Sequence, residues 1–206
     1  MVDAQKLSEA ERDALREIAN IGAGHAATAL SQMTGRKIMI DVPEVEVKRL
    51  EEAAELLGPA DTIVAAVLMH MMGDLTGRTL LVLPERSARA LCAILLRGED
   101  TGAAFTDMQR STVMETGNIL CSAYLNALSD FMGMMLVPSV PALVVDQAGA
   151  VLTTAYLNFG HARDHVICVE TAFRIAGSEE AVTGQFILMP DVASLTAIFD
   201  AIHLAK

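Results

Sequence analysis

The chain has 206 residues, of which 52% are hydrophobic and 4% aromatic, so it can bury one substantial core that aliphatic side chains and methionine must fill. Its formal net charge of −11 argues against nucleic acid and anionic membranes as partners, because both attract clustered lysine and arginine. No apolar run reaches the ~18 residues needed to span a bilayer, so we expect a cytoplasmic protein without membrane insertion.

Three cysteines, Cys92, Cys121 and Cys168, are far apart in the sequence and lie among apolar residues. No C-x-x-C pair is present, so the sequence gives no indication of zinc or redox chemistry. The odd number, together with a polar amino terminus that does not resemble a secretory leader, predicts buried thiols in a reducing compartment.

The first predicted helix begins after Ser8, and Glu11 completes a capping-box pattern three positions later. It should end near Met33, because the Thr-Gly pair that follows is a helix exit. We then predict a strand interrupted at Pro43, a buried strand or pair of strands, a central strand stopped by Pro84, and an amphipathic helix. These segments are 37–50, 62–72, 79–83 and 85–96.

The second half repeats this plan. Thr106 or Asp107 caps a long helix that should run to about Met132 and end at Gly133. Strand-like residues follow at 134–146, then an apolar segment at 150–159 whose type the pattern does not decide, then two further strands and a closing helix. The last three segments are 165–175, 185–190 and 191–206.

Four residues of the first half recur 98 positions later. The pairs are Glu17 and Glu115, Asn20 and Asn118, Gly35 and Gly133, and Pro43 and Pro141. We therefore predict a single domain over 1–206, made by internal duplication from repeats at about 8–97 and 106–205. The expected fold is α/β (α+β), with a mixed or antiparallel sheet that carries two long helices related by a pseudo-two-fold axis.

One face of the first helix carries Asp13, Glu17 and Asn20, which fall within about 60° of one another at 100° per residue, with Gly24 between them. An apolar stripe lies opposite, formed by Leu15, Ile18, Gly22, Ala26, Ala29 and Met33. A carboxylate and an amide should therefore face solvent. Gly24 either leaves room there for the backbone of another protein or is a packing glycine.

The second helix repeats the design with Ser111, Glu115 and Asn118. Its apolar stripe is Val113, Leu120, Tyr124, Ala127 and Phe131. A Glu-Asn pair on a solvated helix is commonplace, but asparagine is a poor helix former and both copies keep it. An amide both donates and accepts hydrogen bonds, so it can hold a water molecule in line with an electrophile, while the glutamate can pair with a cation on a partner.

Other polar groups are weaker candidates. His161, Asp164 and His165 share a polar loop without a third carboxylate or cysteine nearby, so we expect no metal site. His25, within the first helix, and His70, within an apolar run, are expected to be structural.

Both copies fit the motif [D/S]-x3-E-x2-N-x22-P, which resembles that of the CheC/CheX/FliY family of chemotaxis phosphatases. The matching residues are Asp13, Glu17, Asn20 and Pro43 in the first copy and Ser111, Glu115, Asn118 and Pro141 in the second. The resemblance covers essentially the whole chain, and the duplication is similar to CheC rather than to the single-copy CheX.

This resemblance implies a phosphatase that hydrolyses the aspartyl phosphate of the response regulator CheY. It implies that the asparagines orient the attacking water and that the glutamates form salt bridges to a lysine of the regulator. The catalytic Mg²⁺ would belong to the regulator, so no cofactor is expected in this chain. The alternative is a non-catalytic adaptor for the deamidase CheD, or a binding module of the flagellar-switch type.

The resemblance also implies CheD as a partner. Asp146 is the second-copy counterpart of Lys48, and this difference between the halves makes it a candidate for a one-sided partner contact. The plainer alternative is an aspartate that ends a strand or enters a turn.

Overall fold

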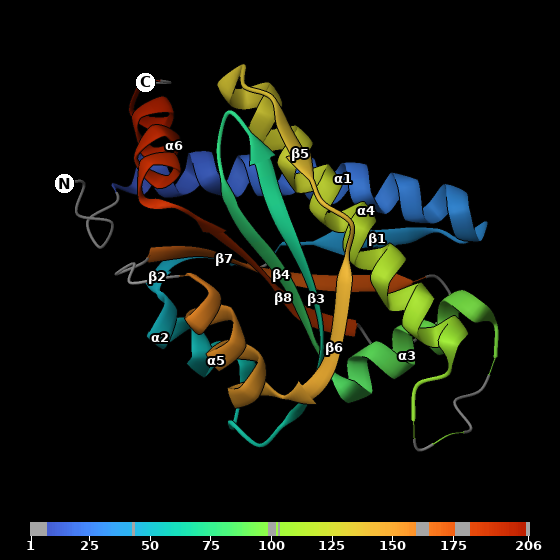
Figure 1. Cartoon of the computed structure of the whole chain (residues 1–206). Helices are drawn as coiled ribbons and strands as arrows, with labels where there is room; N and C mark the ends of the chain where they lie inside the picture. The colour runs from blue at the N-terminus through green and yellow to red at the C-terminus, as the bar shows by residue number, and fades with distance from the viewer. Residues whose placement is uncertain are drawn as a thin grey trace.

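Two long helices, α1 (Glu9–Thr34) and α4 (Asp107–Met132), pack on one face of an antiparallel β-sheet (Figure 1). The structure is a computed structural model of the chain, and it describes residues 8–42, 44–98, 102, 104–159, 165–175 and 182–204. Pro43, His161 and Asp164 therefore lie outside the described residues.

The order helix, two strands, helix, two strands, helix occurs twice along the described chain. In the first half α1 is followed by β1 (Ile38–Asp41), β2 (Val45–Arg49), α2 (Leu50–Ala53) with the 3₁₀ turn η2 (Ala54–Leu57), β3 (Ile63–Gly73), β4 (Gly77–Pro84) and α3 (Glu85–Leu96). In the second half α4 is followed by β5 (Leu136–Pro138), β6 (Ala142–Gln147), α5 (Ala148–Phe159), β7 (His165–Ile175), β8 (Val182–Pro190) and α6 (Val192–Leu204).

The ends of both long helices confirm the boundaries expected from the sequence. The backbone N–H of Ser8 donates to the Glu11 carboxylate at 2.7 Å, which satisfies a donor ahead of the first turn. At α4 the capping box is reciprocal: Thr106 N–H donates to Gln109 Oε1 at 2.9 Å, and Gln109 N–H donates to Thr106 Oγ1 at 3.2 Å. Each helix ends at the predicted glycine in the left-handed conformation, with φ of 66° and 65°.

The sheet interleaves the two halves of the chain. Within the described residues its strand order is β1-β7-β8-β4-β3-β5, with β2 also beside β7 and β6 also beside β3. Every pairing is antiparallel. The edge strands of each half thus pair with the long strand of the other half, and β4 pairs with β8 at the centre.

The register of these pairs is unchanged when the halves are exchanged. Adding 98 to the residue number on an edge strand of the first half, and subtracting 102 from that of its partner on β7, converts one observed pair into another. Ile38 opposite Ile175 becomes Leu136 opposite Gly73, and Val45 opposite Val169 becomes Leu143 opposite Val67. The internal duplication and its pseudo-two-fold axis stay predictions, and this register supports them.

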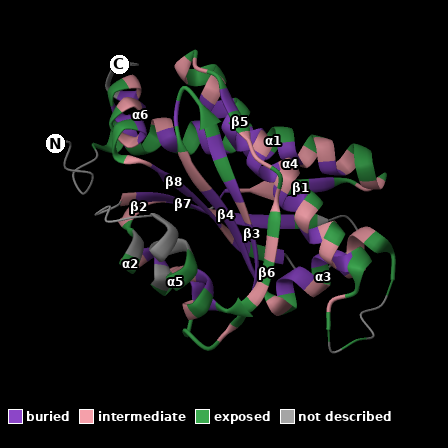
Figure 2. Ribbon diagram, in the orientation of Figure 1, coloured by how far each residue is buried: buried purple, intermediate pink, exposed green. Residues whose placement is uncertain are grey.

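The sheet separates two apolar clusters (Figure 2). The larger one lies under α1 and α4 and extends to α3 and α6 through Leu91 and Phe199. The smaller one lies on the opposite face under α2, η2 and α5, with Leu57 and Val151 among its members. The short helices on this second face are elements that the sequence pattern did not identify as helical.

Two residues assigned to the apolar stripes are exposed instead. Met33 is 51% exposed and Phe131 is 37% exposed. Each lies in the last turn of its helix, just before the glycine that turns the chain away, so little of the core lies beneath it. Within the described ranges, no helix combines the length and apolarity that a membrane span requires.

Asp191 caps α6 and gives stability that depends on pH. Its carboxylate accepts hydrogen bonds from the Ser194 N–H at 2.8 Å and from the Thr76 hydroxyl. Partial burial raises the pKa of Asp191, but these hydrogen bonds and one from Ala193 outweigh it and hold the pKa below its usual value. The cap therefore stabilises the fold above the unfolded-state pKa, and the contribution is lost as the pH falls through the folded-state pKa.

We expect Asp191→Ala to lower the free energy of unfolding by about 1 kcal/mol at neutral pH, because a helix cap is lost. The difference from wild type should shrink below about pH 4, where the carboxyl group protonates. Urea unfolding at neutral and acidic pH measures both effects, with the exposed Asp200→Asn on α6 as the control. A deficit that stays constant across the acid range would contradict this role.

Candidate functional site

The outer face of α1 presents the residues that the sequence placed there. Asp13, Glu17, Asn20 and Gly24 are exposed. The opposite stripe is buried through Leu15, Ile18, Gly22 and Ala26. The amphipathic pattern therefore fixes the orientation of the Glu17 and Asn20 side chains: they project from the helix on the side away from the sheet.

The same arrangement occurs on α4. Ser111 and Glu115 are exposed and Asn118 is half-buried. The buried side of the helix is formed by Val113, Leu120, Tyr124 and Ala127. Each Glu-Asn pair is three residues apart, so its two side chains share one face of one helix.

The four side chains of the two pairs are free within the part of the chain that the structure describes. None of Glu17, Asn20, Glu115 and Asn118 makes a hydrogen bond or ion pair there. Both asparagines lie inside their helices and lower the helix propensity without an intrahelical bond in return. Their amides are therefore available to a water molecule or to another protein.

The remaining motif positions lie around the pairs. Asp13 is held by Arg16 one turn away, with Arg16 Nη1 3.4 Å from Asp13 Oδ1. Pro141 lies half-buried between β5 and β6. Leu143, two residues further on, pairs opposite Val67 of β3. A Cβ atom at Gly117 would lie 2.7 Å from Val67 Cγ1, so the segment of α4 between Glu115 and Asn118 packs on β3, the strand that pairs with β6.

A close contact between α1 and α4 fixes the two helices relative to each other. A Cβ atom at Gly22 would lie 2.4 Å from Tyr124 Cδ1 and 2.9 Å from Tyr124 Cα, so only glycine permits this approach. The Tyr124 ring also packs on Phe186, with 4.6 Å between ring centroids. Its hydroxyl lies 3.4 Å from the Thr171 hydroxyl.

Gly24 differs from the two packing glycines. Apart from its two chain neighbours and the adjoining backbone of α1, no described atom lies within 4 Å of a Cβ built at this position, so the alternative of a packing glycine does not hold. Gly24 is instead bare surface one turn after Asn20.

Asp146 of β6 is exposed and lies opposite Val64 of β3. Lys48 of β2 lies opposite Val166 of β7. The register thus makes these two residues structural equivalents, as the sequence spacing predicts. Lys48 is paired with Glu46 at 2.6 Å, and the hydrogen bond to Glu46 raises the pKa of Lys48. The Asp146 carboxylate accepts a hydrogen bond from the backbone N–H of Gln147 at 2.7 Å, which fits the plainer alternative of a strand-end aspartate.

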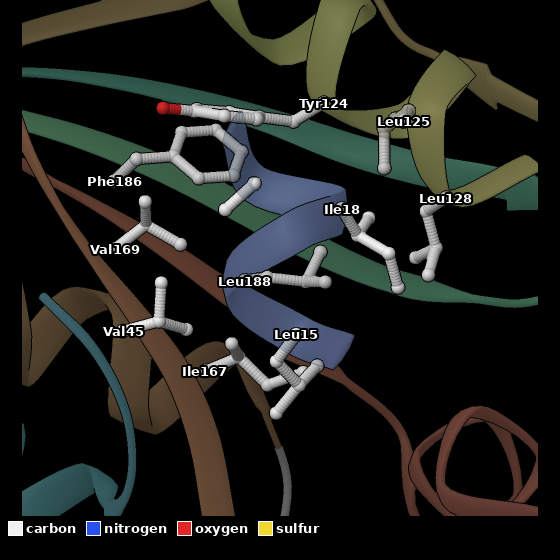
Figure 3. A pocket seen from close by; sticks show the side chains of 11 residues that line it. Leu15, Ile18, Val45, Tyr124, Leu125, Leu128, Ile167, Val169, Phe186 and Leu188 are labelled. Carbon is white, nitrogen blue, oxygen red and sulfur yellow. The ribbon is translucent and has the colours of Figure 1, made fainter. Parts of the chain in front are cut away.

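An apolar cavity of about 40 Å³ lies on the inner side of α1, behind the face that carries Glu17 and Asn20 (Figure 3). Its lining comes from α1, α4, β2, β7 and β8 and includes Ile18, Ala19 and Tyr124. Burial raises the pKa of Tyr124 to about 12, so this hydroxyl stays protonated. The cavity offers no group for phosphate or for an ion.

Among the described residues, thiols and histidines form no second candidate site. Cys92, Cys121 and Cys168 are buried thiols that do not form disulfides. Burial raises the pKa of Cys121 to about 11 and that of Cys168 to about 12, so neither is a nucleophile near neutrality. His25 and His70 are exposed, so neither fills the core. No group of three or more His, Cys, Asp or Glu within the described ranges is placed to hold a metal ion.

Comparison with known proteins identifies the family. The model of the CheC-like family matches residues 11–47 and 108–145, which contain the two Glu-Asn pairs. A CheY-P phosphatase CheC from Bacillus subtilis (strain 168) is 33% identical over 201 residues, or 95% of each chain. The chain belongs to the CheC-like family.

Solved structures agree with the CheC-like fold. FliY from Thermotoga maritima superposes with a TM-score of 0.77 at 22% identity and covers all of both chains. The FliM middle domain from H. pylori superposes with a TM-score of 0.60 at 18% identity, covering 95% of this chain and 99% of that one. At these identities the likeness concerns the fold alone.

One neighbour of the first Glu-Asn pair is not indicated by the sequence pattern of this CheC-like chain. Ile21 follows Asn20 directly and is 44% exposed. An isoleucine inside an amphipathic helix normally belongs to the core face, so the pattern gave no reason to single it out. The angular position of Ile21 on the helix, between the polar face and the buried stripe, is the feature of the sequence that could have indicated its exposure.

The two glycines of α1 should respond in opposite ways to alanine. We expect Gly22→Ala to destabilise the fold by about 1–3 kcal/mol, because the added methyl group overlaps Tyr124. We expect Gly24→Ala to stabilise it by up to about 1 kcal/mol, because the helix gains propensity and nothing is displaced. Urea unfolding of the matched pair measures both, and equal changes of the same sign would contradict the packing described.

Proposed function

We propose that this chain is a phosphatase that hydrolyses the aspartyl phosphate of the response regulator CheY. In this proposal Asn20 and Asn118 each orient the attacking water. Glu17 and Glu115 each anchor the regulator through an ion pair with a lysine. The observation that carries the proposal is a pair of mid-helix asparagines that have no hydrogen-bond partner among the described residues. Each lies three residues after an exposed glutamate, in a chain of the CheC-like family.

The residues suit this chemistry better than covalent catalysis. An amide cannot take up a proton near neutral pH, so the pair is not a nucleophile and base. Hydrolysis of a phosphoryl group mainly requires a positioned water molecule and charge compensation, with little covalent help. The water attacks phosphorus and the aspartate carboxylate of the regulator leaves. The Mg²⁺ that compensates the charge would be bound by the regulator.

The names of relatives support the same activity. The Bacillus subtilis relative is a CheY-P phosphatase, and it aligns with this chain over nearly its whole length. A binding-only module is the alternative, because the FliM middle domain has a similar fold. The free amides on both helices favour catalysis, since an adaptor has no need for a water-positioning group in each half.

CheD binding is a further part of the proposal. Asp146 is the candidate contact, because it is exposed while its equivalent in the first half is a paired lysine. Gly24 would serve the regulator instead, because its bare surface admits a partner's backbone beside Asn20.

Removal of both amides should abolish the acceleration of CheY dephosphorylation. We expect the Asn20→Ala, Asn118→Ala double variant to lose about a hundredfold or more of the acceleration, because the water is no longer held in line. Each single variant should retain the activity of the other helix. The measurement is the decay of phosphorylated CheY with and without the protein.

Asn126→Ala provides the matched control, because Asn126 is exposed on α4 but lies outside the motif. It should leave the decay unchanged. A double variant that still accelerates decay like wild type would show that the catalytic assignment is wrong.

The glutamates should act on binding rather than on the chemical step. We expect Glu17→Gln with Glu115→Gln to raise KM for phosphorylated CheY several-fold, because an ion pair with the regulator is lost. The difference from wild type should narrow at high salt, where exposed ion pairs are screened. Asp130→Asn, an exposed carboxylate near the end of α4, is the control. An unchanged KM would show that Glu17 and Glu115 do not anchor the regulator and are only solvent-exposed surface residues.

A further inference from the structure

An exposed isoleucine distinguishes the first Glu-Asn pair from the second. Ile21 is 44% exposed on α1. Its equivalent on α4, Ile119, is half-buried and packs against the large apolar cluster. The asparagines differ in the same sense, since Asn20 is exposed and Asn118 is half-buried.

The surroundings of Ile21 form a small continuous face, which we call the α1 docking face: Glu17, Asn20, Ile21 and Gly24. Glu17 and Ile21 are four residues apart, so their side chains are neighbours on the helix surface. Outside the adjoining stretch of α1, no described atom lies within 4 Å of the Cβ position of Gly24, and Gly24 adds no side chain that would shield Ile21. A large apolar side chain is thus partly exposed to solvent beside two polar groups, Glu17 and Asn20, that have no partner among the described residues.

We propose that Ile21 is an apolar docking residue for the phosphorylated regulator at the first site, and that the second site lacks this contact. The inference rests on the proposed function. A regulator that pairs with Glu17 while its phosphoryl group meets a water held by Asn20 lies over Ile21, because Ile21 is four residues after Glu17 and is its neighbour on the helix surface. The regulator therefore removes Ile21 from water, whereas Ile119 is already packed within this chain.

The apolar contact should affect affinity and leave the chemical step alone. Ile21 carries no group that can touch the phosphoryl transfer, so its truncation should raise KM and spare kcat. Loss of an apolar contact of this size corresponds to roughly a tenfold change in KM. The first site acting alone should accordingly have a lower KM than the second site acting alone.

The test uses the full chain with one site silenced at a time. In an Asn118→Ala background, Ile21→Ser should raise KM for phosphorylated CheY about tenfold at unchanged kcat, while Ile21→Leu, which restores the apolar area, should stay near the parent. Met33→Ser is the matched control, because Met33 is 51% exposed on α1, against 44% for Ile21, but lies toward the opposite side of the helix. Thermal unfolding of each variant verifies that the fold is retained.

A direct binding measurement separates this inference from the proposed function. The probe is CheY carrying beryllium fluoride in place of the phosphoryl group. If Ile21→Ser binds this probe more weakly than wild type and Met33→Ser does not, the inference is supported without any measurement of hydrolysis. Equal binding by wild type and Ile21→Ser overturns the inference and leaves the phosphatase proposal intact. A wild-type chain that neither binds this probe nor accelerates decay overturns both.

Discussion

The contact between Gly22 and Tyr124 is the constraint on which both candidate sites depend. It brings the backbone of α1 against an aromatic ring of α4 at a distance that no larger residue would permit. Both helices are thereby held on the same face of the sheet, each with its apolar stripe inward. Because a helix that buries one stripe must present the opposite one, the orientation of the two Glu-Asn pairs follows from the packing of the core.

The interleaved sheet explains how one chain can carry two such faces. β3 of the first half pairs with the edge strands of the second half, and β7 pairs with those of the first. Neither half completes a sheet without the other, so the two helices are joined by the whole fold rather than by the connector between them. A shared scaffold also permits the faces to diverge, because a change such as the burial of Ile119 does not alter the strand register.

Much of this architecture could be read from local sequence. The capping boxes, the terminal glycines and the alternation of apolar residues gave the long helices and the central strands, since each signal acts within a few residues. The helices at 50–53 and 148–159 lack a clear apolar period and were not identified. The pairing of β1 with β7 joins residues more than a hundred positions apart, so no local pattern could predict it. For the candidate site, periodicity predicted the outward faces of Glu17 and Asn20, but the unequal burial of Ile21 and Ile119 depends on tertiary packing.

The cavity behind α1 has a mechanical consequence. On α4, Gly117 lies directly against Val67, whereas Ala19, which is 98 positions earlier, lines an empty volume of about 40 Å³. Elimination of that volume corresponds to about 24 mL/mol, a measurable share of the volume change that accompanies unfolding of small proteins. Hydrostatic pressure therefore acts on the junction of the two helices, because Tyr124 and Leu128 of α4 line the same volume as Ala19 of α1. The packing that sets the two Glu-Asn faces relative to each other thus contains compressible space.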